Sequence, residues 1–417
     1  MDAKTWSAGA LVTTMGAALF AAPSSLLAAG FYLQEHGMTG LGRAYAGEAA
    51  AATDASTIYF NPAGMTHLEG NEVQAGLYLL IPDSRVRQTG SQIPGRNSGN
   101  PFEPSTLPNL FWAQEYTEGV WLGFGLSAPF GLKNEYNNNF FARYDSLESD
   151  LTVLNLQPSI AVELNERISI GGGVDLQYAR ATLRSAIPGD LQPENDGRFD
   201  LEGDNVDLGF NIGITFDLSE DTRLGVHYRD GITHTLVGRA KITQPFDGTR
   251  VVVNGEADLD LPAIASIGIR HDLSQRWTAL AQYNYFDWSS FDEIRIELPT
   301  GNQVLPQNYQ DSHAIALGAE YELNPSWTLR GGIQYDETPT QTNGRSTRTP
   351  DGDRLWLSAG ASHAIGDRFH VDLAYSYVHT SSENLDITRE FNGVPVNMQG
   401  RSEGEVHVLG AALRYNY

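Results

Sequence analysis

The chain has 417 residues, with 51 acidic against 27 basic side chains, a formal charge of -24 and no cysteine. A chain this acidic repels phosphate backbones, which argues against nucleic acid as a partner. The absence of cysteine excludes disulfide frameworks, thiolate metal sites and cysteine catalysis. The length admits either two ordinary domains or one large all-β domain.

The first 28 residues have the pattern of a secretory signal peptide. Lys4 precedes a mostly apolar stretch from Ala8 to Leu27, and the small residues Ala28 and Ala29 favour cleavage between them. The alternative is a retained membrane anchor. Elsewhere the sequence has no run of the ~18 apolar residues that a transmembrane helix needs, so a helical membrane protein is excluded.

Residues 29–70 do not alternate between apolar and polar side chains, and they are rich in glycine and alanine. Small residues of this kind permit close backbone packing. Apolar residues such as Phe31, Leu41 and Ile58 are more frequent here than a disordered segment usually tolerates. The segment is therefore predicted to pack as an N-terminal plug, with a disordered arm as the alternative.

From about residue 72 to the C-terminus, apolar and polar residues alternate with period two, which indicates β-strands. For example, Leu208, Phe210 and Ile212 share one face of a strand whose other face is polar or glycine. The pattern predicts fourteen strands, at residues 72–87, 105–117, 119–132, 150–164, 167–185, 204–217, 222–241, 256–272, 276–297, 310–323, 326–338, 353–366, 369–389 and 402–417.

Loop lengths favour a transmembrane barrel over a soluble β-sandwich, because long connections such as 133–149 and 390–401 alternate with tight turns such as 165–166. Aromatic residues cluster near predicted strand ends, as a girdle at the lipid interface requires. They are Trp112, Trp121, Trp277, Tyr285, Trp288, Trp327, Tyr335, Tyr375 and Tyr377. The last strand ends on the aromatic Tyr417, a feature of outer-membrane barrels.

The predicted fold is all-β, a 14-stranded antiparallel transmembrane β-barrel over residues 71–417. Since ~8 strands already fill their own interior, fourteen strands leave a lumen wide enough for water unless something fills it. The N-terminal hatch, residues 29–70, is the predicted filler.

Several motifs carry a family resemblance. The segments Gly40 to Glu48, Asp54-Ala55 and Asn61 to Met65 resemble the hatch domain of the FadL/TodX family of outer-membrane hydrophobic-compound transporters. Further similar segments are Ser127 to Leu132, Tyr178 to Ala181 and Asp353 to Gly360, so the resemblance covers essentially the whole mature chain.

The resemblance implies a monomer in the outer membrane of a Gram-negative bacterium, in contact with its lipid and lipopolysaccharide. Such a protein moves long-chain fatty acids or aromatic hydrocarbons inward without ATP. The hatch and gate positions that it implies are Phe31, Gly42, Arg43, Gly47, Asp54, Asn61, Pro62 and Ala63. Among these, Phe31 matches the hatch end beside the ligand, and Asn61-Pro62-Ala63 matches the element that faces a gap in the wall.

The resemblance also implies a kink in the third strand at Phe130, Gly131 and Leu132, through which the ligand leaves sideways into the membrane. Glycine inside a strand often marks a bend or bulge. From the residues alone, however, Gly131 is equally a glycine before a loop, and Asn61-Pro62 is equally a turn.

The ligand's head group is left open. Fatty-acid members of the family hold the carboxylate with basic wall residues, and a buried carboxylate does need a cation or several donors. The matching positions here are Ser185 and Leu305, which are uncharged. Lys133 is either an outer anchor or a solvated cation at the rim. A neutral aromatic or aliphatic hydrocarbon needs no cation and is the alternative ligand.

Two predicted loops carry candidate surfaces. Tyr136, Phe140, Phe141 and Tyr144 would line an outer groove that captures ligand, or they pack loop against loop. Acidic residues in the loop 186–203 would bind Ca²⁺ or bridge lipopolysaccharide through divalent ions, or they are simply solvated.

No metal site, cofactor or catalytic residue is predicted. The sequence lacks a Gly-x-Ser-x-Gly elbow, a His-Glu-x-x-His motif and a phosphate-binding loop. The remaining alternatives are a general porin, which would lack a hatch, and an outer-membrane enzyme whose site is built on the barrel rim.

Overall fold

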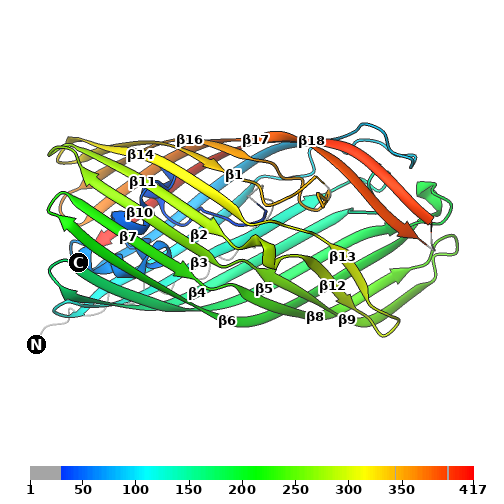
Figure 1. Ribbon diagram of the computed structural model, residues 1–417, viewed down its shortest axis with the longest axis horizontal. Coiled ribbons are helices and arrows are strands. Elements are labelled where there is room, and N and C mark those ends of the chain that lie inside the picture. The colour runs from blue at the N-terminus through cyan, green and yellow to red at the C-terminus, as the bar shows by residue number, and fades with distance from the viewer. Residues whose placement is uncertain (1–29, 343, 392–393) are drawn as a thin grey trace, which may run out of the picture.

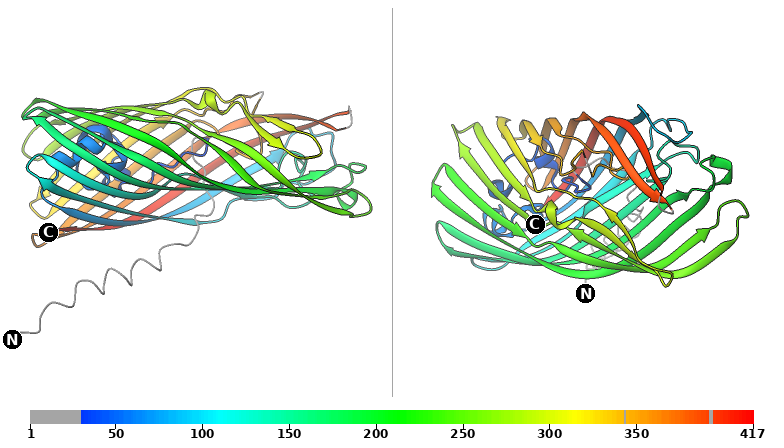
Figure 2. Two further views of the ribbon diagram at one scale, coloured as in Figure 1. Left: turned by 90° about the horizontal axis from the view of Figure 1, so that it is seen from below. Right: turned by 45° about the vertical axis from the view of Figure 1, so that its right-hand side comes forward.

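The computed structural model describes residues 30–342, 344–391 and 394–417, which form a closed antiparallel barrel around a short helical segment (Figures 1 and 2). The predicted signal peptide, residues 1–28, lies outside the described residues, as does Ala29.

The described residues contain eighteen strands. They are β1 (Glu72–Gln88), β2 (Ser105–Thr117), β3 (Val120–Glu135), β4 (Glu148–Asn165), β5 (Ile168–Ile187), β6 (Gly197–Ser219), β7 (Thr222–Arg229), β8 (Ile232–Thr243), β9 (Arg250–Leu261), β10 (Ile264–Asp272), β11 (Trp277–Phe286), β12 (Glu293–Glu297), β13 (Gln303–Pro306), β14 (Ser312–Asn324), β15 (Trp327–Asp336), β16 (Arg354–Ile365), β17 (Phe369–Phe391) and β18 (Val394–Asn416).

These strands fill fourteen positions in the barrel wall, which confirms the predicted fold. Four positions are each shared by two consecutive strands, namely β7 with β8, β9 with β10, β11 with β12, and β13 with β14. Thus β6 pairs with both β7 and β8, while β10 pairs with β7 and β9 pairs with β8. The break between β9 and β10 falls at Pro262, which has no N–H to donate to a ladder. Pairing of β1 with β18 closes the barrel.

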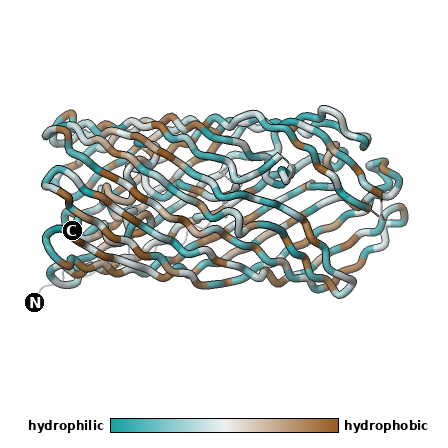
Figure 3. The backbone as a smooth tube through the Cα atoms, viewed as in Figure 1, coloured by the Kyte–Doolittle hydropathy of each residue, from teal (hydrophilic) through white to brown (hydrophobic). Residues whose placement is uncertain are grey.

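The apolar face of each strand points outward over much of the wall. On β6, Leu208, Phe210 and Ile212 are 62%, 49% and 56% exposed, whereas Asn211, which points inward, is 2% exposed. Figure 3 shows the corresponding alternation of hydrophobic and hydrophilic residues along the strands. An outward apolar face with a polar lumen is the arrangement of a barrel surrounded by lipid.

The prediction of a long loop at residues 390–401 was wrong, because β17 and β18 continue as a paired ladder as far as Phe391 and Val394. In this extension the apolar residues, including Ile387 and Met398, face inward and are buried. Their outward neighbours, such as Asn397, are polar. The apolar face thus changes sides above the lipid-facing region, because the inner face covers packed loops and the outer face meets water.

Most of the predicted aromatic girdle does lie outward, since Trp277, Trp327 and Tyr375 are exposed. Trp121 and Trp288 are exceptions to the prediction because both are buried inside the barrel. Trp288 begins the short 3-10 helix η3 (Trp288–Ser290), which turns its ring inward.

The segment before β1 lies inside the barrel, where Figure 1 shows it in dark blue. Its elements are α2 (Met38–Leu41), α3 (Glu48–Ala51), α4 (Thr57–Phe60) and the 3-10 helix η1 (Pro62–His67). Another 3-10 helix, η2 (Pro193–Asn195), lies in the loop after β5. Among the described residues, no helix is both long enough and apolar enough to cross a membrane.

Candidate functional site

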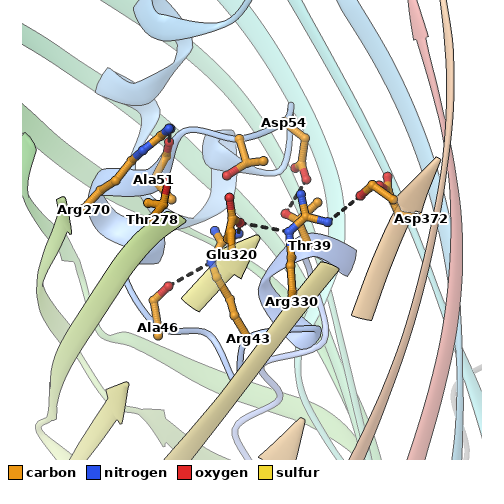
Figure 4. Close-up of polar contacts among 12 residues, drawn as sticks. Thr39, Arg43, Ala46, Ala51, Asp54, Arg270, Thr278, Glu320, Arg330 and Asp372 are labelled. Atoms are coloured by element: carbon orange, nitrogen blue, oxygen red, sulfur yellow. Dashed lines mark hydrogen bonds and ion pairs between the residues drawn. The ribbon is translucent and has the colours of Figure 1, made fainter. Parts of the chain in front are cut away.

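The body of the hatch, residues 38–67, is fixed to the barrel wall by buried charges. The Arg43 guanidinium is fully buried and donates to Glu48 at 2.7 Å, to Glu320 of β14 at 2.5 Å and to the backbone oxygen of Ala46 at 2.9 Å. Arg330 of β15 meets Glu320 from the other side at 2.9 Å (Figure 4). Burial raises the pKa of Glu48 to about 7 despite the neighbouring Arg43.

A second buried connection runs through Asp54, which is 1% exposed. Its carboxylate accepts hydrogen bonds from the Thr39 hydroxyl at 2.6 Å and from the Ser56 backbone N–H at 2.9 Å. The backbone N–H of Ala55, the residue between Asp54 and Ser56, donates to the Glu72 carboxylate of β1 at 2.6 Å. Asp54 therefore links two turns of the hatch and places them against the first strand of the wall.

Two of the predicted hatch glycines allow a close approach to the wall. A Cβ at Gly42 would lie 3.0 Å from the Cα of Gly360 on β16. Gly47 has a φ of 73°, a conformation that L side chains rarely adopt, and it packs on Leu280 of β11. Both positions need glycine for a physical reason.

The Asn61-Pro62-Ala63 turn lies against β5 and β6. The Asn61 side chain donates to the backbone oxygens of Ala49 at 2.7 Å and of Ile214 at 3.2 Å, and it accepts from the Ala63 N–H at 3.1 Å. A Cβ at Gly171 of β5 would be 2.4 Å from the Ala63 nitrogen. This turn thus joins the hatch to the wall on the β5–β6 side, while another part of the hatch covers the irregular part of β3.

The irregularity in β3 is a bulge at residues 128–129. Ser127 is opposite Asn155 of β4, but Phe130 is opposite Val153, so β3 carries one extra residue. The ladder between β2 and β3 stops at the pair Leu110 and Leu126. Phe130, Gly131 and Leu132, the predicted kink residues, follow directly after the bulge and are buried.

The hatch end, residues 30–36, pairs with β3 at this point. Tyr32 lies opposite Phe130 in an antiparallel bridge. The Leu33 N–H donates to the Pro129 oxygen at 2.8 Å, and the Gly131 N–H donates to the Phe31 oxygen at 3.0 Å. Because β4 occupies the other edge of β3, the hatch end takes the edge that β2 leaves unpaired.

The Phe31 ring is enclosed by other aromatic rings. Its centroid is 4.7 Å from that of Trp288, 5.2 Å from that of Phe291 and 6.0 Å from that of Phe130. The adjacent Gly30 N–H donates to the Asp351 carboxylate at 2.9 Å. Asn109 of β2 also donates to the His36 oxygen at 2.9 Å, and Gln334 of β15 donates to the Gln34 side-chain oxygen at 3.2 Å. Aromatic contacts and these five hydrogen bonds hold the hatch end, with few charges.

An apolar cavity adjoins Phe31 and the segment after the bulge. Phe31 of the hatch end lines it, together with leucines and other apolar side chains from β3 to β9, among them Leu132, Leu151, Leu201, Leu236 and Leu259. A cavity with this apolar lining suits a hydrophobic small molecule.

The four loop aromatics predicted as an outer groove are buried. Tyr136, Phe140, Phe141 and Tyr144 are between 0% and 4% exposed, in one core with residues such as Met398 of β18. Tyr136 and Phe140 stack with centroids 4.1 Å apart. The structure therefore buries these rings against one another, against loop residues and against the inner faces of extended strands such as β17 and β18, instead of along an exposed groove.

Three of the acidic residues predicted as a cation site, Asp196, Asp200 and Glu202, pair with arginines. Asp196 accepts from Arg143 at 2.5 Å and Asp200 from Arg184 at 2.5 Å. Lys133, the predicted outer anchor, lies 3.4 Å from Asp150. Within the described residues no group of three or more potential ligands gathers as a metal site would require.

Sequence reasoning missed the contribution of the loop 337–353, described apart from residue 343. Arg348 and Thr349 line the cavity, and Asp351 holds Gly30. The loop has two arginines, Arg345 and Arg348, and no sequence pattern distinguishes the one that faces the cavity.

A lipid-facing barrel with a plug fixed inside it and an apolar cavity beside the plug defines an outer-membrane transport protein. The sequence profile of the family described as outer membrane protein transport protein (OMPP1/FadL/TodX) matches residues 19–417. The chain belongs to this family. It is a multi-pass protein of the Gram-negative outer membrane, and like its family it is a transport protein and not an enzyme.

Individual relatives agree along the whole chain. A long-chain fatty acid transport protein from Escherichia coli O6:H1 is 28% identical over 93% of this chain and 94% of that protein. The crystal structure of a Pseudomonas aeruginosa FadL homologue superposes with a TM-score of 0.87 at 21% identity, covering 93% and 100% of the two chains. The P. putida toluene transporter TodX superposes with a TM-score of 0.71 at 19% identity, covering 90% and 98%. At these identities, the similarity to the two solved structures shows that this chain shares their fold.

Proposed function

We propose that this protein takes up long-chain fatty acids passively across the outer membrane. Ligand captured at the extracellular loops enters the apolar cavity beside Phe31. Displacement of the hatch end then opens the edge of β3, and the ligand leaves sideways into the membrane. No energy coupling is involved, since consumption of the ligand inside keeps the flow inward.

The observation that carries this proposal is that the cavity and the hatch end, residues 30–36, meet at Phe31. Phe31 is at once part of the cavity wall and the residue whose oxygen accepts from Gly131 at the bulge. A ligand that fills the cavity therefore competes for space with the segment that covers β3. Such competition is a physical route from ligand binding to opening.

The hatch end is also the weakly held part of the plug. Two backbone hydrogen bonds connect it to β3, whereas the hatch body is held by buried ion pairs and by Asn61. A local opening of residues 30–36 is thus less costly than release of the whole plug.

Neutral hydrocarbons are the alternative cargo. The uncharged Ser185 and Leu305 and the mainly apolar cavity wall favour them. TodX, which shares the fold, is named a toluene transporter. The same gate would serve either kind of ligand.

The test is uptake into a transporter-deficient outer membrane or into liposomes. Radiolabelled oleate is compared with toluene and hexadecane, with glucose as the polar control. We expect oleate to enter fastest. Faster uptake of the hydrocarbons would favour the alternative, and entry of glucose alone would replace both with a general porin.

A further inference from the structure

The cavity contains a positive charge that the sequence did not reveal. Arg348 lines the cavity, is 5% exposed and is the one cation among the lining residues described. A charged group taken out of water is costly unless an opposite charge or several acceptors surround it. The surroundings of this guanidinium therefore need an explanation.

Arg348 has few partners among the described residues. Its Nη1 donates to the Ser149 hydroxyl of β4 at 3.3 Å, and its buried Nε has no hydrogen-bond partner. No carboxylate lies within ion-pair distance of it in the described residues. Burial lowers the pKa of Arg348 to about 10, which still leaves it protonated at neutral pH.

A neighbouring arginine on the same loop shows what a structural role looks like. The Arg345 guanidinium donates to the Thr340 hydroxyl and backbone oxygen, to Glu383 and to the Asn384 oxygen. Its donors are thus used for fixing the loop. The Arg348 side chain has the same chemistry and similar burial, yet most of its N–H donors make no hydrogen bond with the described residues.

The backbone on both sides of Arg348 is firmly held. The Asp145 carboxylate accepts from the Ser346 hydroxyl and from the Thr347 N–H, each at 2.7 Å, and it also pairs with Arg389. Asn134 donates to the Arg348 oxygen at 2.5 Å. Asp145, the nearest buried acid, is therefore occupied, and the Arg348 side chain is positioned at the cavity wall before any ligand arrives.

Two acids also line the cavity, but each has a partner of its own. Asp150 lies 3.4 Å from Lys133, and Asp258 accepts from the Thr235 hydroxyl at 2.9 Å. Both are partly exposed, in contrast to the buried guanidinium.

We propose that Arg348, supported by the Ser149 hydroxyl, binds the carboxylate of a long-chain acid whose hydrocarbon chain fills the apolar cavity. This inference rests on the proposed function and specifies its ligand. The cation comes from the loop 337–353 and not from the wall positions Ser185 and Leu305. The same loop holds Gly30 through Asp351, so the head of the ligand binds three residues from the hydrogen bond that fixes the hatch end.

The experiment compares two ligands that differ only in the head group. The full-length protein is purified in a non-ionic detergent, and the dissociation constants of oleate and oleyl alcohol are measured. The variants are Arg348→Gln, Arg348→Lys and, as a matched loss of one positive charge, Arg250→Gln at the exposed start of β9.

We expect Arg348→Gln to weaken oleate binding by about tenfold to hundredfold, the usual effect of losing a charge-assisted hydrogen bond. Binding of oleyl alcohol should hardly change. Arg348→Lys should keep part of the affinity for oleate because it keeps the charge, and Arg250→Gln should bind both ligands as the wild type does.

Three results would overturn the inference. Arg348→Gln could bind oleate as tightly as the wild type, or weaken both ligands equally, or weaken oleate no more than Arg348→Lys does. Each leaves the proposed function intact if wild-type uptake of oleate continues. Wild-type protein that binds oleate no more tightly than oleyl alcohol and transports neither would instead remove the proposed function itself.

Discussion

The body and the end of the hatch fill the same lumen but are held by different forces. The body, residues 38–67, is fixed by Arg43, Glu320 and Arg330 and by the capped Asn61 turn. The end, residues 30–36, is held by aromatic contacts, by Asp351, by two backbone hydrogen bonds to β3 and by side-chain hydrogen bonds from Asn109 and Gln334.

This difference indicates a division of labour within one short segment. Breaking a buried ion-pair network leaves uncompensated charges, so the hatch body is expected to stay in place. Separating rings and a few hydrogen bonds between uncharged groups or to Asp351 costs less, particularly when a hydrophobic ligand can take the place of the Phe31 ring. The four predictions below test whether the two regions do behave differently.

The largest effect is expected from locking the hatch end to the wall. Tyr32 and Phe130 form a non-hydrogen-bonded antiparallel pair, for which Cα atoms lie about 4.5 Å apart, within disulfide range. The chain has no other cysteine. We expect the double variant Tyr32→Cys with Phe130→Cys to lose oleate uptake when oxidised and to regain it on reduction.

The measurement is the initial rate of labelled oleate uptake with and without a reducing agent. Each single cysteine variant, treated with the same oxidant, is the control. Transport at the wild-type rate by the oxidised double variant would show that the hatch end does not move during transport.

The second prediction concerns the hatch body. Arg43→Met leaves Glu48 buried without its cation and leaves Glu320 with Arg330 alone, so the free energy of local opening of residues 38–67 should fall by about 3–5 kcal/mol. Native-state hydrogen exchange measures this quantity. Arg87→Gln, which breaks an exposed pair with Glu403, should change the opening free energy by less than about 1 kcal/mol. An equal effect of both variants would contradict the role given to Arg43.

The third prediction tests the segment after the bulge. Gly131→Val puts a β-branched side chain, which favours regular strand, next to the hydrogen bond between Gly131 and Phe31. We expect uptake to fall severalfold while the barrel still assembles, with Gly131→Ala intermediate. Uptake rates and heat-modifiable migration on gels measure the two properties. Normal uptake by the valine variant would count against exit beside Gly131.

The smallest effect is a pH dependence at the hatch end. Burial raises the pKa of Glu35 from 4.5 to about 7, so the docked end binds a proton that the open end releases. The stabilisation is therefore complete below pH 4.5 and is lost as the pH rises through 7. Protease sensitivity of residues 30–36 should be greater at pH 8 than at pH 5.

Glu35→Gln should remove this pH dependence, because the amide does not titrate. Glu69→Gln, which changes an exposed glutamate after the hatch body, is the matched control and should retain it. A pH dependence that survives in Glu35→Gln would assign the titration to another group.

Much of the fold could be predicted because strand alternation is local. Leu208, Phe210 and Ile212 mark an outward face whatever their partners are, and the long and short connections give the number of wall positions. The hatch motifs were likewise identified correctly as the part inside the lumen. Local pattern failed where the environment of a strand changes, as in the inward apolar face near Met398.

The candidate site was less predictable because its contacts join distant residues. The aromatic residues of the loop 136–147 gave no sign that strand ends from β17 and β18 would bury them. The Asn61 turn was expected to face the gap beside β3, and nothing in the sequence indicated that the Phe31 to Leu33 segment would pair with β3 there. Arg348 donates a hydrogen bond to Ser149, which lies 199 residues earlier in the chain.

The sequence by itself determined that this chain is a fourteen-position outer-membrane barrel with an N-terminal plug. It did so because lipid outside and a polar lumen inside impose period two on each strand independently. Only the tertiary structure decided which hatch residues cover β3 and which cation faces the cavity. Those choices depend on closure of the barrel, which brings the loop 337–353, the hatch end and β3 to β9 around one space that no local pattern describes.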